Sequence, residues 1–229
     1  MDKIDFRKVY KKLYSAPEDD FALVEVPPLS YLMFDGQGDP NTAPAYVQAI
    51  EALYSLSYTL KFMSKRAFGR DYVVGPLEGL WWAQAQSDKV DTTFRKDCAT
   101  MKYDMAAFAE RRKDDWSWTM MILQPDWITA EHVQAAKAEV LMKKGLPGIE
   151  TTRLEVLEEG LCAQILHVGP YDAEGPALLR LHQDWLPAHG LLETGHHHEI
   201  YLSDPRKVAP EKLKTILRQP VKRLDTKAV

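Results

Sequence analysis

The chain has 229 residues and a formal net charge of −4, from 29 basic and 33 acidic side chains. Hydrophobic residues make up 45% of it and charged residues 27%, which excludes a disordered chain and predicts a packed core. Since no excess of positive charge would attract phosphates, nucleic acid is not expected as a partner.

Residues 1–14 predict a short amphipathic helix. Phe6, Val9, Tyr10 and Leu13 recur at helical spacing, and Pro17 ends the pattern. The segment is charged and lacks the apolar centre of a signal peptide, and no run in the chain approaches the roughly 18 apolar residues of a membrane helix. With only two cysteines, far apart in the sequence, these features predict a soluble cytoplasmic protein and no membrane partner.

The next segments predict strand, helix and strand. Residues 21–34 are rich in strand formers but broken by two prolines, so we expect one kinked edge strand or two short ones. After the loop DGQGDP, Asn41 or Thr42 is expected to cap a long helix whose apolar face covers a sheet. A strand is then expected within residues 71–83.

Residues 86–115 differ from their surroundings in being strongly charged, and we interpret them as a surface insertion or lid. A strand follows within residues 116–127. Thr129 then opens a second amphipathic helix, which runs to Lys144 before GLPG ends it.

The second half of the chain repeats this plan. The strand LCAQILHVG is followed by a helix from about Pro176, then by the strands HHHEIYLSD and TILRQPVKR. In both halves a strand, a glycine and a Pro-Ala pair precede the helix.

The repeat predicts an α+β fold: a tandem, pseudo-two-fold pair of β-α-β-β units with antiparallel sheets, helices on one face and a central ligand cleft. We assign residues 1–229 to one domain, with the first pseudo-repeat at about 21–127 and the second at about 159–224.

Alternation along the strand at 196–202 selects the first candidate site. Ile200 and Leu202 share one face and are expected under the helices, which leaves His197, Glu199 and Tyr201 on the groove side. A carboxylate beside a phenol in an aromatic groove suits ligand binding or acid/base work. The alternative is a solvated glutamate on an exposed strand.

The segment PLEGLWWA supplies a second set of candidates. Glu78 and Trp82 share a face, so we expect them in the cleft, while Trp81 faces away. Tyr171 ends a strand and either lies over the cleft mouth or is a plain turn residue.

Three consecutive histidines at 196–198 invite a metal interpretation, but alternation sends them to opposite faces, and neither HExxH nor CxxC spacing occurs. The sequence also lacks GxGxxG, GxxxxGK[ST] and GxSxG. No metal and no cofactor are therefore expected.

The stretches DGQGDPN, EALYSLSYTLKFM, PLEGLWWA, TMMILQPD, HVGPYDAEGPA and HHEIYLSDPRKVAPEKLKTILRQPV resemble the free-standing branch of the GyrI-like small-molecule-binding superfamily. The resemblance covers nearly the whole chain. It implies a central aromatic cleft with an acidic residue that accepts planar hydrophobic or cationic molecules, and some members of this branch are cyclopropanoid cyclopropyl hydrolases, which detoxify DNA-alkylating compounds.

Under this resemblance Glu199 matches the pocket glutamate of the family. The hypothesis for the site assigns catalysis to Glu199 as base, with Tyr201 or Tyr171 stabilising developing negative charge. The expected ligand-binding residues are Glu78, Trp82, Tyr31, Tyr54, Trp185 and His197.

Two functions stay open on this evidence: a hydrolase of cyclopropanoid toxins, and a multidrug-binding protein that sequesters ligands without turnover. A third, weaker hypothesis is that the charged insertion contacts a protein partner, as small gyrase-inhibiting relatives do.

Overall fold

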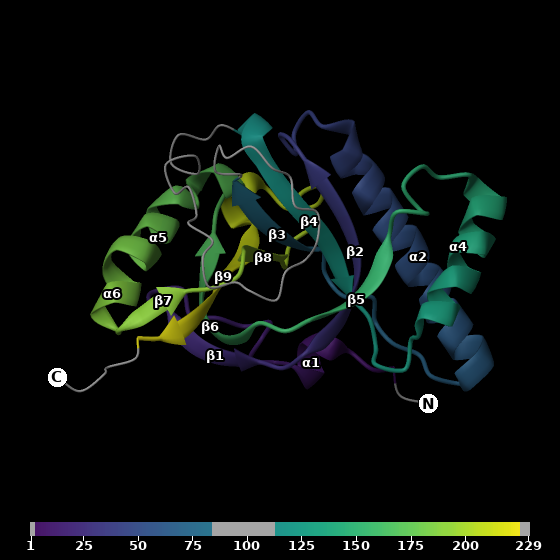
Figure 1. The fold of residues 1–229 in the computed structure, drawn as a ribbon, viewed down its shortest axis with the longest axis horizontal. Helices are drawn as coiled ribbons and strands as arrows, with labels where there is room; N and C mark the ends of the chain where they lie inside the picture. Colours follow the sequence, from purple (N-terminus) through teal and green to yellow (C-terminus); the bar gives the residue numbers. More distant parts are fainter. Residues whose placement is uncertain (1–2, 84–112, 225–229) are drawn as a thin grey trace.

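The computed structural model describes residues 3–83 and 113–224 (Figure 1). Within these ranges nine strands pair in a mostly continuous antiparallel sheet, ordered β1-β6-β9-β8-β3-β4-β2-β5, with β7 paired to β9. The strands are β1 (Ala22–Val26), β2 (Leu29–Gln37), β3 (Glu78–Ala83), β4 (Trp116–Leu123), β5 (Arg153–Leu157), β6 (Gly160–Val168), β7 (Leu191–Glu193), β8 (His197–Tyr201) and β9 (Lys214–Arg223).

The helices follow the strands in a repeated order. They are α1 (Phe6–Val9), α2 (Pro44–Phe68), α4 (Ala130–Lys144), and a continuous helical stretch of α5 (Gly175–Arg180), the π-helical turn η4 (Leu181–Trp185) and α6 (Leu186–Ala188). None of the described helices is long and apolar enough to span a membrane.

The strand order confirms the predicted tandem of β-α-β-β units. One unit is β2-α2-β3-β4 and the other is β6-α5-β8-β9; each places its third element at the centre of the sheet. There β3 and β8 pair antiparallel, with Gly79 opposite Glu199, as a two-fold relation between the units requires.

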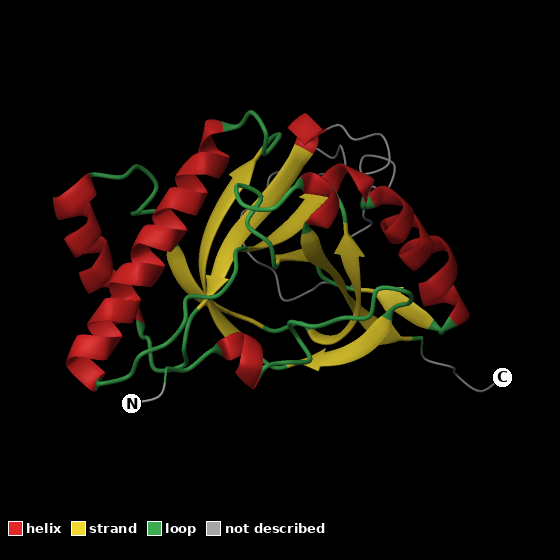
Figure 2. Ribbon diagram, turned by 180° about the vertical axis from the view of Figure 1, so that it is seen from behind, coloured by secondary structure: helices red, strands yellow, loops and turns green. Residues whose placement is uncertain are grey.

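Both groups of helices lie over one face of the sheet, at opposite ends (Figure 2). Under α2 and α4 the core includes Leu53, Leu56 and Trp118, and under η4 and α6 it includes Trp185 and Leu217. The central strands β3 and β8 lie between these two cores, so the helices leave part of this face uncovered.

This arrangement corrects one expectation. The helices lie on the face of the sheet that carries Glu199 and Tyr201, to either side of them, whereas Ile200 lies on the opposite face, fully buried, as the strand partner of Glu78. Alternation assigned the residues to two faces correctly, but both faces of β8 are buried, so hydrophobicity did not identify the helical one.

The opposite face is closed by the N-terminal segment and by a buried polar network. His198 lies 3.0 Å from Glu78 and 3.0 Å from Glu159, and Arg218 lies 3.4 Å from Glu159. Arg218 also donates to the carbonyl oxygen of Leu13 at 2.6 Å, which ties the N-terminal segment to β9. This network supports β8 from behind the face that carries Glu199.

Some boundaries differ from the prediction. The helix α2 begins at Pro44, and its N-cap is Ala43, whose side chain has no acceptor; the expected cap Asn41 donates to Asp39 instead. Strand β3 occupies only the end of residues 71–83, and two strands, β5 and β7, were not predicted.

The expected insertion at 86–115 falls outside the described residues except for Lys113–Asp115, as does the hypothesis that it binds a partner.

The close approach of β2 and β4 makes Gly36 hard to replace. A Cβ at this position would lie 2.1 Å from the ring of Trp118. That ring is fully buried and donates to the carbonyl oxygen of Gly38 at 3.2 Å. We expect Gly36→Ala to lower the free energy of unfolding by about 1–3 kcal/mol, measured by urea denaturation. Gly175→Ala, where an added Cβ meets nothing within 4 Å, is the control and should change stability by less than about 0.5 kcal/mol.

Candidate functional site

A pocket of about 740 Å³ lies between α2 and the turn before α5, over β3 and β8. Its aromatic wall comes from both units: Tyr46, Tyr54 and Tyr58 from α2, and Trp81, Trp116, Tyr171 and Tyr201 from the strands and the turn after β6. The pocket therefore occupies the part of the sheet that the two groups of helices leave uncovered, as the predicted central cleft requires.

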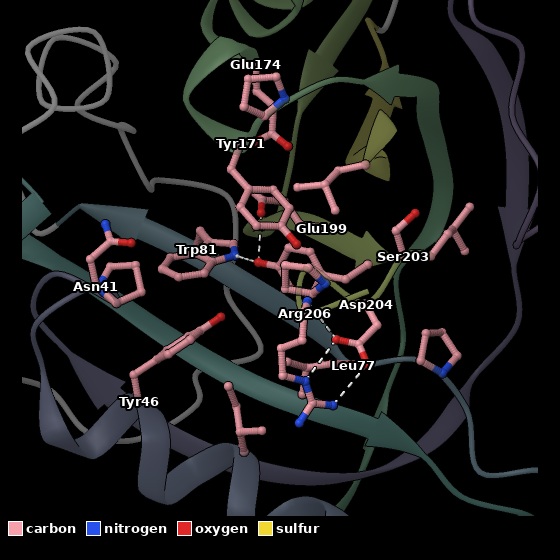
Figure 3. Close-up of a pocket in the computed structure, with 18 of the residues that line it drawn as sticks. Asn41, Tyr46, Leu77, Trp81, Tyr171, Glu174, Glu199, Ser203, Asp204 and Arg206 are labelled. Carbon is pink, nitrogen blue, oxygen red and sulfur yellow. Dashed lines mark hydrogen bonds and ion pairs between the residues drawn. The ribbon is translucent and has the colours of Figure 1, made fainter. Parts of the chain in front are cut away.

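A chain of hydrogen bonds crosses the floor of the pocket (Figure 3). Trp81 Nε1 donates to the hydroxyl oxygen of Tyr201 at 2.9 Å, and that hydroxyl donates to Glu199 Oε2 at 2.7 Å. Burial, and next the charge of Glu199, raise the pKa of Tyr201 well above its ordinary value, so this phenol stays protonated. Its single proton is committed to Glu199, whose position it fixes.

Glu199 is enclosed rather than solvated. Its side chain is 12% exposed, and the other oxygen, Oε1, lies 3.7 Å from His197 Nε2. The His197 ring is buried, neither of its nitrogens has a hydrogen-bond partner within the described chain, and it does not line the pocket. His197 thus lies beside Glu199 but outside the pocket, and of these two residues only Glu199 lines the pocket.

Tyr171 stands at the mouth of the pocket. The residue is 37% exposed, and its ring meets that of Tyr201 edge-on at 5.5 Å. Burial, with a smaller contribution from the charge of Glu174, raises the pKa of Tyr171 to about 12. In the described part of the structure its hydroxyl has no hydrogen-bond partner, so it is able to donate to a ligand.

The sequence analysis did not predict Glu174, the second carboxyl group of the pocket. It follows the turn η3 (Tyr171–Ala173) and immediately precedes α5. Its side chain is buried, and Oε1 has no hydrogen-bond partner in the regions described. Composition gave no signal for it, because the motif GPYDAEGPA contains two acidic residues and only the fold shows that Asp172 is exposed and Glu174 is not.

Of the residues predicted for the site, Glu199, Tyr201, Tyr171 and Tyr54 line this pocket. Glu78 and Tyr31 do not: they lie on the opposite face of the sheet, where Tyr31 donates to Glu78 at 3.3 Å. Trp185 packs in the core beneath η4.

The assignment of the two tryptophans is reversed. Trp81 lines the pocket, and Trp82, on the other face of β3, stacks on His196 with ring centroids 4.2 Å apart. The two-residue period was correct, but the choice of face was not, since both faces of β3 are covered.

Comparison with known proteins gives a family and close structural relatives. The model of a family described as the GyrI-like small molecule binding domain matches residues 19–222. A solved structure of an uncharacterized conserved protein from Listeria innocua is 40% identical, with a TM-score of 0.79, covering 96% of this chain and 100% of that one.

A second solved structure, of a hydrolase from Listeria innocua, is 38% identical, with a TM-score of 0.76 and the same coverage of both chains, 96% and 100%. The comparison with curated proteins gives no match.

Proposed function

This chain belongs to the GyrI-like small molecule binding domain family, and from that premise we propose that its pocket binds bulky planar hydrophobic or cationic molecules and hydrolyses the cyclopropane of cyclopropanoid compounds. The observation that carries the proposal is the enclosed carboxylate of Glu199, held by the Tyr201 hydroxyl at 2.7 Å inside an aromatic pocket. The likeness to a Listeria hydrolase, 38% identical over nearly the whole chain, supports the catalytic part.

The pocket walls favour flat aromatic ligands. Tyr46 from α2 and Trp81 from β3 have ring centroids 6.3 Å apart, and Trp116 meets Trp81 edge-on at 5.7 Å. Aromatic side chains bind flat apolar molecules by stacking or edge contacts, and a nearby carboxylate adds attraction for a cation. A volume of about 740 Å³ is in the range of pockets that enclose drug-sized molecules.

The same groups can open a spirocyclopropyl dienone. Glu199 takes a proton from a water molecule, whose oxygen forms a bond to the ring CH₂. The cyclopropane C–C bond breaks, and its electron pair moves through the dienone to the carbonyl oxygen, which becomes a phenolate. The phenolate takes up a proton from solvent, and Glu199 returns its proton to solvent, so that the net change is the addition of one water. The Tyr171 hydroxyl is the available donor to that oxygen. Tyr201, whose hydroxyl donates its hydrogen bond to Glu199, acts as a positioning residue.

The test is to incubate the purified protein with a spirocyclopropyl dienone and to follow the ring-opened alcohol, which carries the mass of one added water. We expect conversion above the rate in buffer. Tight binding with unchanged compound would overturn hydrolysis and leave the second candidate, a protein that sequesters such ligands. If the compound is neither bound nor converted, both parts of the proposal are contradicted.

A further inference from the structure

The pocket contains two carboxyl groups, and one of them has an unused oxygen. Glu174 is 5% exposed, lines the pocket, and has no hydrogen-bond partner for Oε1 within residues 3–83 and 113–224. In Figure 3 it lies on the same side of the pocket as Tyr171 and Glu199. A buried polar oxygen without a partner is costly, so its presence at a pocket wall indicates a group that meets a ligand.

The cations around the pocket are engaged elsewhere. Lys113 pairs with Asp172 at 3.0 Å, Arg206 with Asp204 at 2.9 Å, and Arg7 lies 3.5 Å from Asp5. Several groups neighbour the two carboxyls: Tyr46 from α2, Tyr171 and Asp172 from η3, His197 and Tyr201 from β8, and Thr215 from β9. Apart from His197 beside Glu199, these groups are neutral or acidic.

A buried carboxyl group beside a second carboxylate, with no dedicated cation, holds its proton more tightly than an exposed one. We propose that Glu174 carries a proton in the free pocket, beside Glu199, and that a planar organic cation displaces this proton when it binds. The inference rests on the proposed function, because it concerns the same pocket, and it identifies the favoured ligands as single cations.

The electrostatics of Glu174 agree with this assignment. Burial, and next the charge of Glu199, raise the pKa of Glu174 well above its ordinary value, so it keeps its proton after an exposed glutamate has lost it. When a fixed cation binds, the O–H bond breaks and the proton passes to solvent, with no other bond changed. Cation affinity should therefore increase with pH, by about tenfold per unit, until Glu174 has lost its proton in the free protein.

The experiment uses 10-methylacridinium, whose charge is fixed, and acridine, a neutral molecule of nearly the same shape at neutral pH. Calorimetric titrations in buffers of different ionisation enthalpy give the number of protons released. With the wild-type protein we expect about one proton released by the cation and none by acridine. Binding of the cation without proton release would overturn the inference while leaving the proposed function intact.

The variant Glu174→Gln tests whether the released proton comes from Glu174 or from another group. It should bind both compounds, release no proton, and show cation affinity that does not change with pH. Asp184→Asn, which removes an exposed carboxylate from the following helical turn, is the control and should behave as wild type. Should Glu174→Gln fail to fold, Glu174→Met removes the same carboxyl group and should also abolish the release.

Two further outcomes decide the matter. Proton release that persists in Glu174→Gln would assign the proton to another group and overturn the inference. If neither compound binds the wild-type protein, the proposed function is contradicted, and the inference with it.

Discussion

Replacement of Arg218 by methionine is expected to lower the free energy of unfolding by about 3–5 kcal/mol. Arg218 is 1% exposed and its guanidinium contacts Glu159, Gln164 and the carbonyl oxygen of Leu13. Methionine fills a similar volume but removes one of the two cationic partners that Glu159 has in the described structure, and leaves it with His198. An uncompensated buried charge is far costlier than a lost surface pair, and urea denaturation measures the difference.

Lys143→Met provides the matched control, because it also removes a cation from an ion pair. Lys143 is 62% exposed and lies 2.6 Å from Glu139, so its loss should cost less than about 1 kcal/mol. A further variant that replaces both Arg218 and Glu159 by neutral residues should cost less than the sum of the single changes. Equal losses for Arg218→Met and Lys143→Met would contradict a stabilising role for the buried network.

The network also has a signed pH dependence. Burial alone would lower the pKa of His198, but Glu159 and Glu78 raise it above its ordinary value. Its contribution to stability is complete below the unfolded pKa and is lost as the pH rises through the raised one. Burial alone would raise the pKa of Glu159, but His198 and Arg218 lower it, so its contribution is lost as the pH falls through that lowered value. The network therefore contributes most to stability at pH values between the pKa of Glu159 and the pKa of His198.

Much of the fold was predictable, because its evidence is local. Helix periodicity and the glycine at Gly145 marked the second helix, and repeated strand-helix order indicated two matching units. The strand β5 was missed: its central residues are half-buried rather than alternating, and its pairing with β2 is a long-range contact that no local pattern encodes. The end strand β7 has three residues, too few for a periodic signal.

The candidate site was predictable only in part. Period-two alternation placed Glu199 and Tyr201 on one face, and they do lie together in the pocket. Alternation alone does not say which face is the pocket, however, and the sheet buries both faces, one under helices and one against the N-terminal segment. Glu78 and Trp82 were consequently assigned to the cleft in place of Trp81. Glu174 depends on a turn whose orientation only the tertiary structure determines.

Replacement of Glu199 by glutamine should reduce turnover of a spirocyclopropyl dienone by about 10²–10⁴-fold, the range expected when a general base is removed. Glutamine has nearly the same shape and its carbonyl oxygen can accept the Tyr201 hydroxyl proton, as Glu199 Oε2 does at 2.7 Å. The pocket should therefore keep its form, and acridine, a neutral flat ligand, should bind within about threefold of its wild-type affinity. The loss is then in kcat rather than in binding.

Two comparisons make this result specific to the base. Glu211→Gln removes an exposed carboxylate from the turn before β9 and should leave turnover unchanged. Tyr201→Phe removes the hydrogen bond that positions Glu199, so it should lower kcat less than Glu199→Gln does, because the base itself remains. If Glu199→Gln turned over the dienone at the wild-type rate, water activation would belong to another group.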